Sequence, residues 1–124
     1  MKTTDLSSIA IAVALFVGLS QVAFAQSAVY TVENLLEPCV EGDNDSRWGA
    51  AAEAECEQYI KGFTDAYGLL RDNGKADNVC LPAQNRLDEI RWAFMRWAHK
   101  NFDDRTQPAP DALLAVIKEH FTCT

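Results

Sequence analysis

The sequence predicts an all-α fold, a small bundle of about four helices that is stapled by disulfides. The first observation is the stretch 56–70 (CEQYIKGFTDAYGLL), whose apolar side chains recur at the three-and-four spacing of one helix face turned towards a core. The second is that shorter stretches with the same period precede and follow it. The third is the presence of 4 cysteines, because an even number in a short exported chain indicates two disulfides. We therefore expect residues 56–70 to lie in a central helix.

Residues 1–25 have the order of a cleavable export signal. A weakly positive start at Lys2 is followed by the apolar run 9–19, and Ala23-Phe24-Ala25 has the small-x-small pattern of a cleavage site. The alternative is an uncleaved membrane anchor, but the apolar run is much shorter than the twenty or so residues that a membrane-spanning helix needs. We expect cleavage after Ala25, export to the periplasm, no stable membrane association, and a single domain over residues 26–124.

The charge of the chain limits its partners. It has 18 acidic and 11 basic side chains and a net charge of −7. Binding to nucleic acid or to an anionic membrane requires a basic surface, so no nucleic-acid partner is expected. The acidic excess either steers a basic partner or only keeps the protein soluble.

A first short helix is expected over residues 29–39. Thr31 is its predicted N-cap, and Pro38 indicates a frayed or broken end. Its inward positions are Val32, Leu35, Leu36 and Cys39. The polar turn 41–46 that follows does not fit a calcium loop, because Arg47 and Trp48 stand where a ligand and a glycine are needed.

The central helix is expected to begin near Arg47, with Asp45 or Ser46 as its cap, and to end at Arg71 before Asn73-Gly74. Its predicted inward side chains are Cys56, Tyr59, Ile60, Phe63, Ala66, Tyr67 and Leu70.

Three positions inside this helix raise separate questions. Gly62 and Gly68 weaken helix propensity, and such glycines usually indicate that another helix approaches closely. Asp65 either hydrogen-bonds a neighbouring helix end or faces solvent.

A third helix is expected over residues 86–100, capped by Asn85. At 100° per residue, Trp92 lies nearly opposite its inner stripe. A tryptophan there either anchors a protein interface or is covered by another part of the fold. The inner stripe consists of Leu87, Ile90, Phe94, Trp97 and Ala98.

The longest polar connection is residues 101–110, which Pro108 and Pro110 stiffen. Asp111 is the predicted cap of a last helix that Cys123 ends. The inward side chains of that helix are Leu113, Leu114, Ile117 and Phe121.

Three disulfide pairings are possible. Short connections make neighbouring helices antiparallel, which places Cys80 and Cys123 at one pole and Cys39 and Cys56 nearer the other. This favours the pairs Cys39–Cys56 and Cys80–Cys123, although Cys56 lies far enough along its helix to strain the first pair.

The sequence contains no set of residues that indicates catalysis. His99 and His120 fall at the ends of different helices, no CxxC pair is present, and no nucleotide-binding or hydrolase motif occurs. We therefore expect no enzyme activity, no cofactor and no metal site.

Four motifs, in order, carry a resemblance to a known family. They are Leu35-Leu36-x-x-Cys39, Cys56-x-x-Tyr59-Ile60-x-Gly62-x-x-Asp65, Cys80-Leu81-Pro82 and Phe121-x-Cys123. In these motifs the chain resembles the Rap/Tai family of immunity proteins, which protect bacteria against amidase effectors of type VI secretion. The resemblance implies a small helical periplasmic protein, often dimeric, that blocks a peptidoglycan-cleaving amidase by inserting an exposed loop into its active-site cleft.

On this interpretation, the expected contact loop consists of Asp103, Asp104, Arg105 and Thr106, because a loop stiffened by prolines can fill a cleft at a low ordering cost. Trp92 is the expected contact in a homodimer or partner interface. The alternative is a general periplasmic binding or chaperone-like protein that uses the same scaffold.

Overall fold

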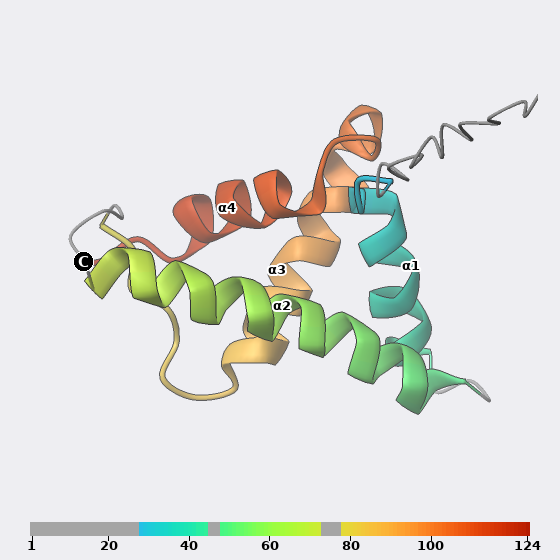
Figure 1. The fold of residues 1–124 in the computed structure, drawn as a ribbon, viewed down its shortest axis with the longest axis horizontal. Coiled ribbons are helices and arrows are strands. Elements are labelled where there is room, and N and C mark those ends of the chain that lie inside the picture. Colours follow the sequence, from blue (N-terminus) through green and yellow to red (C-terminus); the bar gives the residue numbers. More distant parts are fainter. Residues whose placement is uncertain (1–27, 45–47, 73–77) are drawn as a thin grey trace, which may run out of the picture.

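The computed structural model describes residues 28–44, 48–72 and 78–124. These residues form four α-helices and one short 3-10 helix, and they contain no strand beyond two isolated bridges. Figure 1 shows α2 lying across the molecule, with α1 at one end and α4 and the C-terminus towards the other. The helices are α1 (Val32–Asp43), α2 (Gly49–Asp72), α3 (Arg86–Lys100), η1 (Phe102–Asp104) and α4 (Ala109–His120). The predicted all-α bundle is confirmed, while the expected signal peptide and its cleavage site after Ala25 lie outside the described residues.

Helix α1 begins as predicted and ends later. The Thr31 side chain accepts a hydrogen bond from the backbone N–H of Asn34, and the Asn34 side chain accepts one from the backbone N–H of Thr31, which together form a capping box. The expected end near Pro38 is wrong, because the helix continues to Asp43. Pro38 has no N–H that could donate to the carbonyl of Asn34, four residues earlier. This carbonyl instead accepts a hydrogen bond from the hydroxyl of Tyr30 at 3.0 Å.

Helix α2 buries most of the predicted stripe. Cys56, Ile60 and Tyr67 are buried, whereas Ala66 and Leu70 are exposed and were wrongly predicted to face inward. Thr64 takes an inward position instead, and its hydroxyl donates to the carbonyl of Lys61 at 3.0 Å. A helix tolerates this buried hydroxyl because its own backbone supplies the acceptor.

Asp65 faces solvent, which settles the choice left open by its sequence. Its carboxylate pairs with Lys61 at 2.6 Å, one turn back on the same exposed face of α2. The predicted cap at Asp45 or Ser46 and the predicted stop at Asn73-Gly74 lie outside the described residues.

Another helix does not approach closely at Gly62 or Gly68, the two glycines for which the sequence predicted it. A Cβ built at Gly62 or Gly68 would have no atom of another element within 4 Å. A Cβ built at Gly42 would lie 2.8 Å from the Cα of Glu53. Helices α1 and α2 therefore approach each other at Gly42, a residue that the sequence pattern assigned to a turn.

Helix α3 has the predicted bounds, but Asn85 does not cap it with its side chain. Asn85 has a positive φ of 49° and makes no side-chain capping hydrogen bond. Ile90, Phe94 and Ala98 are fully buried as expected.

Helix α4 begins two residues before the predicted cap Asp111, which lies exposed in its first turn. Pro108 is the N-cap, and Pro110 lies in the first turn. A proline is tolerated there because backbone N–H groups in the first turn have no acceptor within the helix. The helix ends at His120, so Cys123 belongs to an extended tail rather than to the helix.

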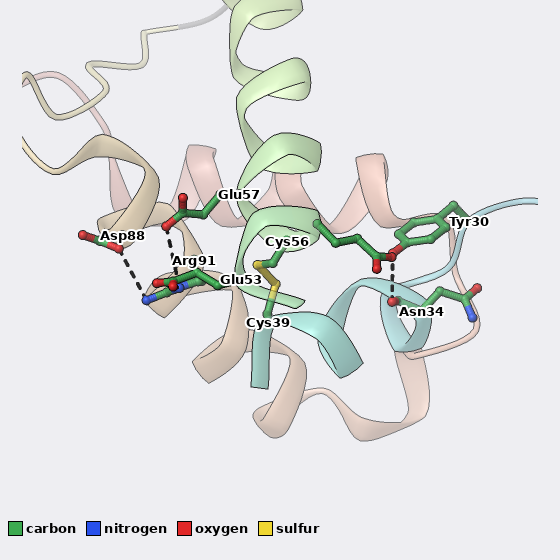
Figure 2. Close-up of a disulfide and its surroundings, with 9 residues drawn as sticks. Tyr30, Asn34, Cys39, Glu53, Cys56, Glu57, Asp88 and Arg91 are labelled. Atoms are coloured by element: carbon green, nitrogen blue, oxygen red, sulfur yellow. Dashed lines mark hydrogen bonds and ion pairs between the residues drawn. A yellow bond between two sulfur atoms is a disulfide. The ribbon is translucent and has the colours of Figure 1, made fainter. Parts of the chain in front are cut away.

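The two disulfides have the pairing that the sequence favoured. Cys39–Cys56 links α1 to α2 inside the main core (Figure 2), with Cα atoms 5.0 Å apart, and Cys80–Cys123 links the segment before α3 to the C-terminal tail. The close approach at Gly42, one turn from Cys39, brings the two helices within reach of the first disulfide. In the part of the chain that is described, no helix is long and apolar enough to cross a membrane.

Candidate partner-binding surface

The connection between α3 and α4 lies across the start of α1 and is held there by backbone hydrogen bonds. The N–H of Val32 donates to the carbonyl of Gln107 at 3.0 Å, and the N–H of Glu33 donates to that of Arg105 at 3.0 Å. The N–H of Ala109 donates to the carbonyl of Tyr30 at 2.9 Å. The first amides of a helix have no partner within it, so the start of α1 and the loop satisfy each other. The loop is therefore a fixed part of the fold.

The four loop residues expected at the interface have two different environments. The side chains of Asp103, Asp104 and Thr106 are exposed. Arg105 is half-buried, and its guanidinium carbon lies 4.3 Å from the centre of the Phe102 ring. A guanidinium over an aromatic face is attracted to the ring, so Arg105 helps to hold the loop. Three of the four predicted residues are thus presented to solvent.

Phe102 is a surface residue that the sequence argument overlooked. Its side chain is 66% exposed. An exposed aromatic beside two acids is suited to a protein interface, and its place at the start of a polar connection was the only signal in the sequence.

Trp92 lies apart from the loop. It is 48% exposed on the outer face of α3, as its position opposite the inner stripe predicted. Asn101, the C-cap of α3, follows it by nine positions, which is a rise of about 13 Å. The loop and Trp92 are therefore two separate features of the surface.

Two grooves flank α1, and acidic side chains line both. The groove towards the loop has a volume of about 380 Å³, and the groove towards α2 has about 370 Å³. The first is lined by Glu33, Leu36, Glu37, Val40, Glu41, His99 and Arg105. The second is lined by Tyr30, Asn34, Glu37, Pro38, Glu41, Ala52 and Glu55. Apolar and carboxylate side chains line both grooves, so each has the composition to accept a long basic side chain along its aliphatic stem.

The excess of acidic side chains is concentrated around α1. Residues 61–124 carry nine acidic and nine basic side chains, so the whole net charge of −7 resides in residues 26–60. Those residues include α1 and the first half of α2. The surface around α1 is therefore strongly negative, while the rest of the chain is balanced.

Tyr30 lies in this negative field. Burial, followed by the hydrogen bond to Glu55 and the charge of Glu55, raises the pKa of Tyr30 to about 12. Its hydroxyl is 3.0 Å from a carboxylate oxygen of Glu55. Burial also raises the pKa of Tyr59, whose ring stacks on that of Tyr30 with centroids 4.8 Å apart.

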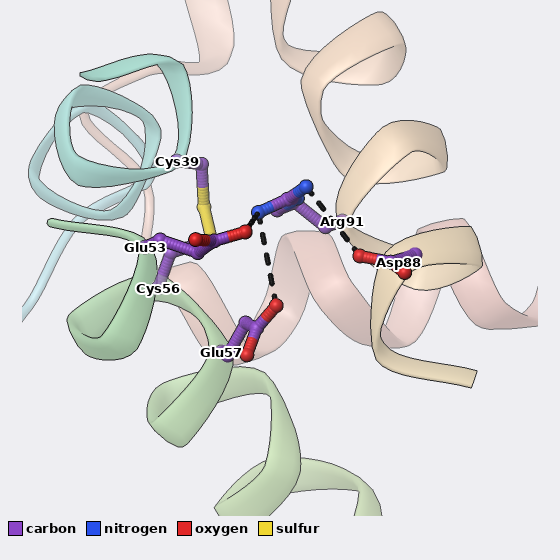
Figure 3. A network of polar contacts seen from close by, with 6 residues as sticks. All are labelled: Cys39, Glu53, Cys56, Glu57, Asp88 and Arg91. Atoms are coloured by element: carbon purple, nitrogen blue, oxygen red, sulfur yellow. Dashed lines mark hydrogen bonds and ion pairs between the residues drawn. A yellow bond between two sulfur atoms is a disulfide. The ribbon is translucent and has the colours of Figure 1, made fainter. Parts of the chain in front are cut away.

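A buried arginine joins α2 to α3 behind this surface. Arg91 is 5% exposed, and Figure 3 shows it among three carboxylates close to the Cys39–Cys56 disulfide. Its guanidinium nitrogens lie 3.1 Å from Glu53, 3.8 Å from Glu57 and 3.4 Å from Asp88. No sequence pattern predicts this cluster, because Arg91 adjoins the exposed Trp92 and its partners on α2 are distant in the chain. The cluster has a structural role, since its cation is enclosed by the protein's own carboxylates.

The described residues contain no group of three or more histidine, cysteine or carboxylate side chains that could hold a metal ion. Both disulfides together use all four cysteines. The surface around α1 offers shape and charge to a macromolecule.

Residues 31–123 match the family model of the Rap1a immunity proteins. No curated protein and no solved structure shows a match to the chain. The matched region includes the four α-helices and both disulfides. Immunity proteins of this family are inhibitors that bind a protein effector, and they are not enzymes. The chain belongs to the Rap1a family of immunity proteins.

Proposed function

We propose that this protein is a periplasmic immunity protein that binds a peptidoglycan amidase effector of a type VI secretion system and occludes its active site. The family match supports an effector as the partner. The sequence pattern of residues 1–25, which predicts an export signal with cleavage after Ala25, supports a periplasmic location. Two disulfides support the same location, because they form and persist in an oxidising compartment.

The observation that carries the proposal is the loop fixed across the start of α1. Asp103, Asp104 and Thr106 project from a segment that three backbone hydrogen bonds tie to the adjoining chain. A segment that is already ordered loses little conformational freedom when it binds. This loop is therefore the part of the protein that enters the effector cleft.

The partner surface is basic. The exposed loop acids adjoin α1, where the net charge of the chain is concentrated. Complementary charge raises the association rate and selects among partners. The complex should therefore form more slowly as the salt concentration rises. At 0.1 M salt, the attraction between exposed charges is largely screened beyond about 10 Å.

Trp92 supplies a second contact, either with the effector or with a second copy of the chain. Its position on α3, away from the loop, leaves it free to form a homodimer while the loop engages the effector. Sedimentation of the wild type and of Trp92→Ala separates the two roles. A dimer that Trp92→Ala converts to a monomer assigns the residue to the homodimer, whereas an unchanged monomer assigns it to the effector.

Calorimetry with a purified amidase effector from the same genome tests the proposed function. We expect one saturable complex, and we expect Asp103→Lys/Asp104→Lys to weaken it by about tenfold or more. Asp65→Lys/Asp72→Lys is a matched control, because it makes the same change in net charge on α2, away from the loop. Equal weakening by both variants would contradict the assigned contact loop.

The absence of any complex would contradict the function itself. A chaperone-like protein on the same scaffold would instead expose apolar surface on acidification, which a dye-binding titration detects. Dye binding that rises with acidification and no effector complex would favour that alternative.

A further inference from the structure

The two disulfides differ in their access to solvent. Cys39 and Cys56 are both 0% exposed and belong to the main core between α1 and α2. Cys80 is exposed and Cys123 is half-buried. Thiol–disulfide exchange requires an attacking thiolate to reach one of the sulfur atoms. Only the second disulfide is open to that attack while the protein stays folded.

The second disulfide fastens a short tail that follows α4. Helix α4 ends at His120, and the tail beyond it forms a single bridge between Thr122 and Val79. The N–H of Cys80 donates to the carbonyl of Phe121 at 2.7 Å, and the N–H of Cys123 donates to that of Asn78 at 3.2 Å.

Phe121 gives the tail a role in packing. Its half-buried ring lies against both core clusters, the main one and a smaller one formed by Tyr67, Val79 and Ile117. The smaller cluster is at the end of the molecule that carries the C-terminus, opposite α1 (Figure 1). The tail therefore covers this end of the core and is fastened by the accessible disulfide.

We propose that Cys80–Cys123 is a reducible latch on the C-terminal tail, whereas Cys39–Cys56 is a permanent link within the core. A dithiol reductant opens the latch in two steps. One of its thiolates attacks a sulfur of Cys80–Cys123, which breaks the disulfide and forms a mixed disulfide with the protein. The second thiol then closes a cyclic disulfide in the reductant. Cys80 and Cys123 remain as two thiols that have gained two electrons and two protons.

Opening the latch frees the tail and leaves the other end of the protein intact. Once the disulfide is broken, two backbone hydrogen bonds and the packing of Phe121 hold the tail, and such contacts open locally without global unfolding. Cys39–Cys56, Gly42 and the loop of residues 102–106 belong to the end that contains α1. The inference does not depend on the identity of the partner.

Graded reduction of the folded, oxidised chain tests the proposal. The protein is treated with increasing dithiothreitol, free thiols are capped with iodoacetamide, and the capped cysteines are identified by peptide mass analysis. Cys80 and Cys123 should become capped at least about tenfold faster than Cys39 and Cys56. Equal rates, or earlier capping of Cys39 and Cys56, would overturn the proposal.

The same treatment in concentrated urea is the control for accessibility. Both disulfides should then be reduced at similar rates, because unfolding exposes all four sulfurs. A difference as large as that in the folded chain would show that the fold is not its cause, and would also overturn the proposal.

A variant and hydrogen exchange test the effect on the tail. In Cys80→Ser/Cys123→Ser, the amides of residues 80 and 123 should exchange about tenfold faster or more, while those of Ile60 and Phe94 stay protected. Thermal unfolding of this variant should remain cooperative. Unchanged exchange in the tail, or loss of cooperative unfolding, would contradict a latch that acts only on the tail.

Discussion

The hydroxyl of Tyr30 donates a hydrogen bond to the carbonyl oxygen of Asn34 at 3.0 Å, and it shares its one proton with a carboxylate oxygen of Glu55, also at 3.0 Å. In a regular helix this carbonyl would accept from the residue four positions later, which is Pro38 and has no N–H. Tyr30 precedes the helix and supplies the missing donor from outside it (Figure 2). This relationship explains how α1 continues through a proline to Asp43.

The first prediction concerns this substitute donor. Tyr30→Phe should lower the free energy of unfolding by about 1 kcal/mol, because it leaves the Asn34 carbonyl without its partner. In a Pro38→Ala background the loss should shrink, since the new backbone N–H can reach Asn34. Urea denaturation of the four proteins in the double-mutant cycle measures the difference.

Tyr59→Phe is the control for this cycle, because it keeps the ring that stacks on Tyr30. The hydroxyl that it removes makes no hydrogen bond among the residues that the structure describes. It should change stability little. An equal effect of Tyr30→Phe with and without Pro38 would contradict the explanation.

The second prediction is the ionisation of Tyr30. Burial, with the hydrogen bond and charge of Glu55, raises its pKa from 10.0 to about 12. A pKa that is higher in the folded state favours folding while the hydroxyl stays protonated. This contribution is complete below pH 10 and is lost as the pH rises from 10 towards about 12. Absorbance of the tyrosinate, compared between wild type and Tyr30→Phe, gives the pKa of Tyr30.

Glu55→Gln should lower this pKa, because it removes the charge while keeping a side chain of the same size. A pKa of Tyr30 that does not change in Glu55→Gln would show that the carboxylate has no part in it.

The third prediction compares two glycines in helices. Gly42→Ala should destabilise the protein by about 1–3 kcal/mol, because the new Cβ would press on the backbone of Glu53. Gly62→Ala should stabilise it by about 1 kcal/mol, because nothing lies near its Cβ and alanine favours the helix. Thermal unfolding of both variants measures the contrast. A destabilising Gly62→Ala would indicate that the outer face of α2 is covered in solution, as in a dimer.

The fourth prediction uses the unequal burial around Arg91. The arginine side chain is 6% exposed, whereas those of Glu53 and Asp88 are 44% and 54% exposed. Glu53→Gln/Asp88→Asn should cost about 3 kcal/mol or more, because it removes the two closer carboxylates and leaves the buried cation with Glu57 at 3.8 Å. Arg91→Met should cost less, because water can reach the carboxylates that it leaves behind. Urea denaturation ranks the two proteins, and the reverse order would contradict the structural role of the cluster.

Local patterns in the sequence predicted much of the scaffold. The cap at Thr31, the bounds of α3 and the outward position of Trp92 depend on residues close together in the chain. The favoured disulfide pairing is the one that the structure has, although α1 and α3 cross α2 in Figure 1 and do not run antiparallel to it as the sequence argument assumed. The local features need no knowledge of how distant surfaces meet.

The features that the sequence did not predict depend on side-chain and backbone contacts that appear only in the folded chain, whether the partners are close together or distant in the sequence. The extension of α1 requires the Tyr30 hydroxyl to reach the Asn34 carbonyl, and the close approach at Gly42 requires Glu53 to lie opposite it. Arg105 was assigned to a contact loop as a polar residue, but its ring contact with Phe102 half-buries it. For the same reason, the site was predicted as a loop, whereas the adjoining acidic grooves of α1 became evident only from the fold.

The most direct test of the central claim is a titration of amidase activity. A purified amidase effector from the same genome is mixed with increasing amounts of this protein, and the cleavage of peptidoglycan is measured. We expect cleavage to fall to the background level near one immunity chain per amidase, and to recover partly with Asp103→Lys/Asp104→Lys. Undiminished cleavage in the presence of excess protein would contradict the account for that effector.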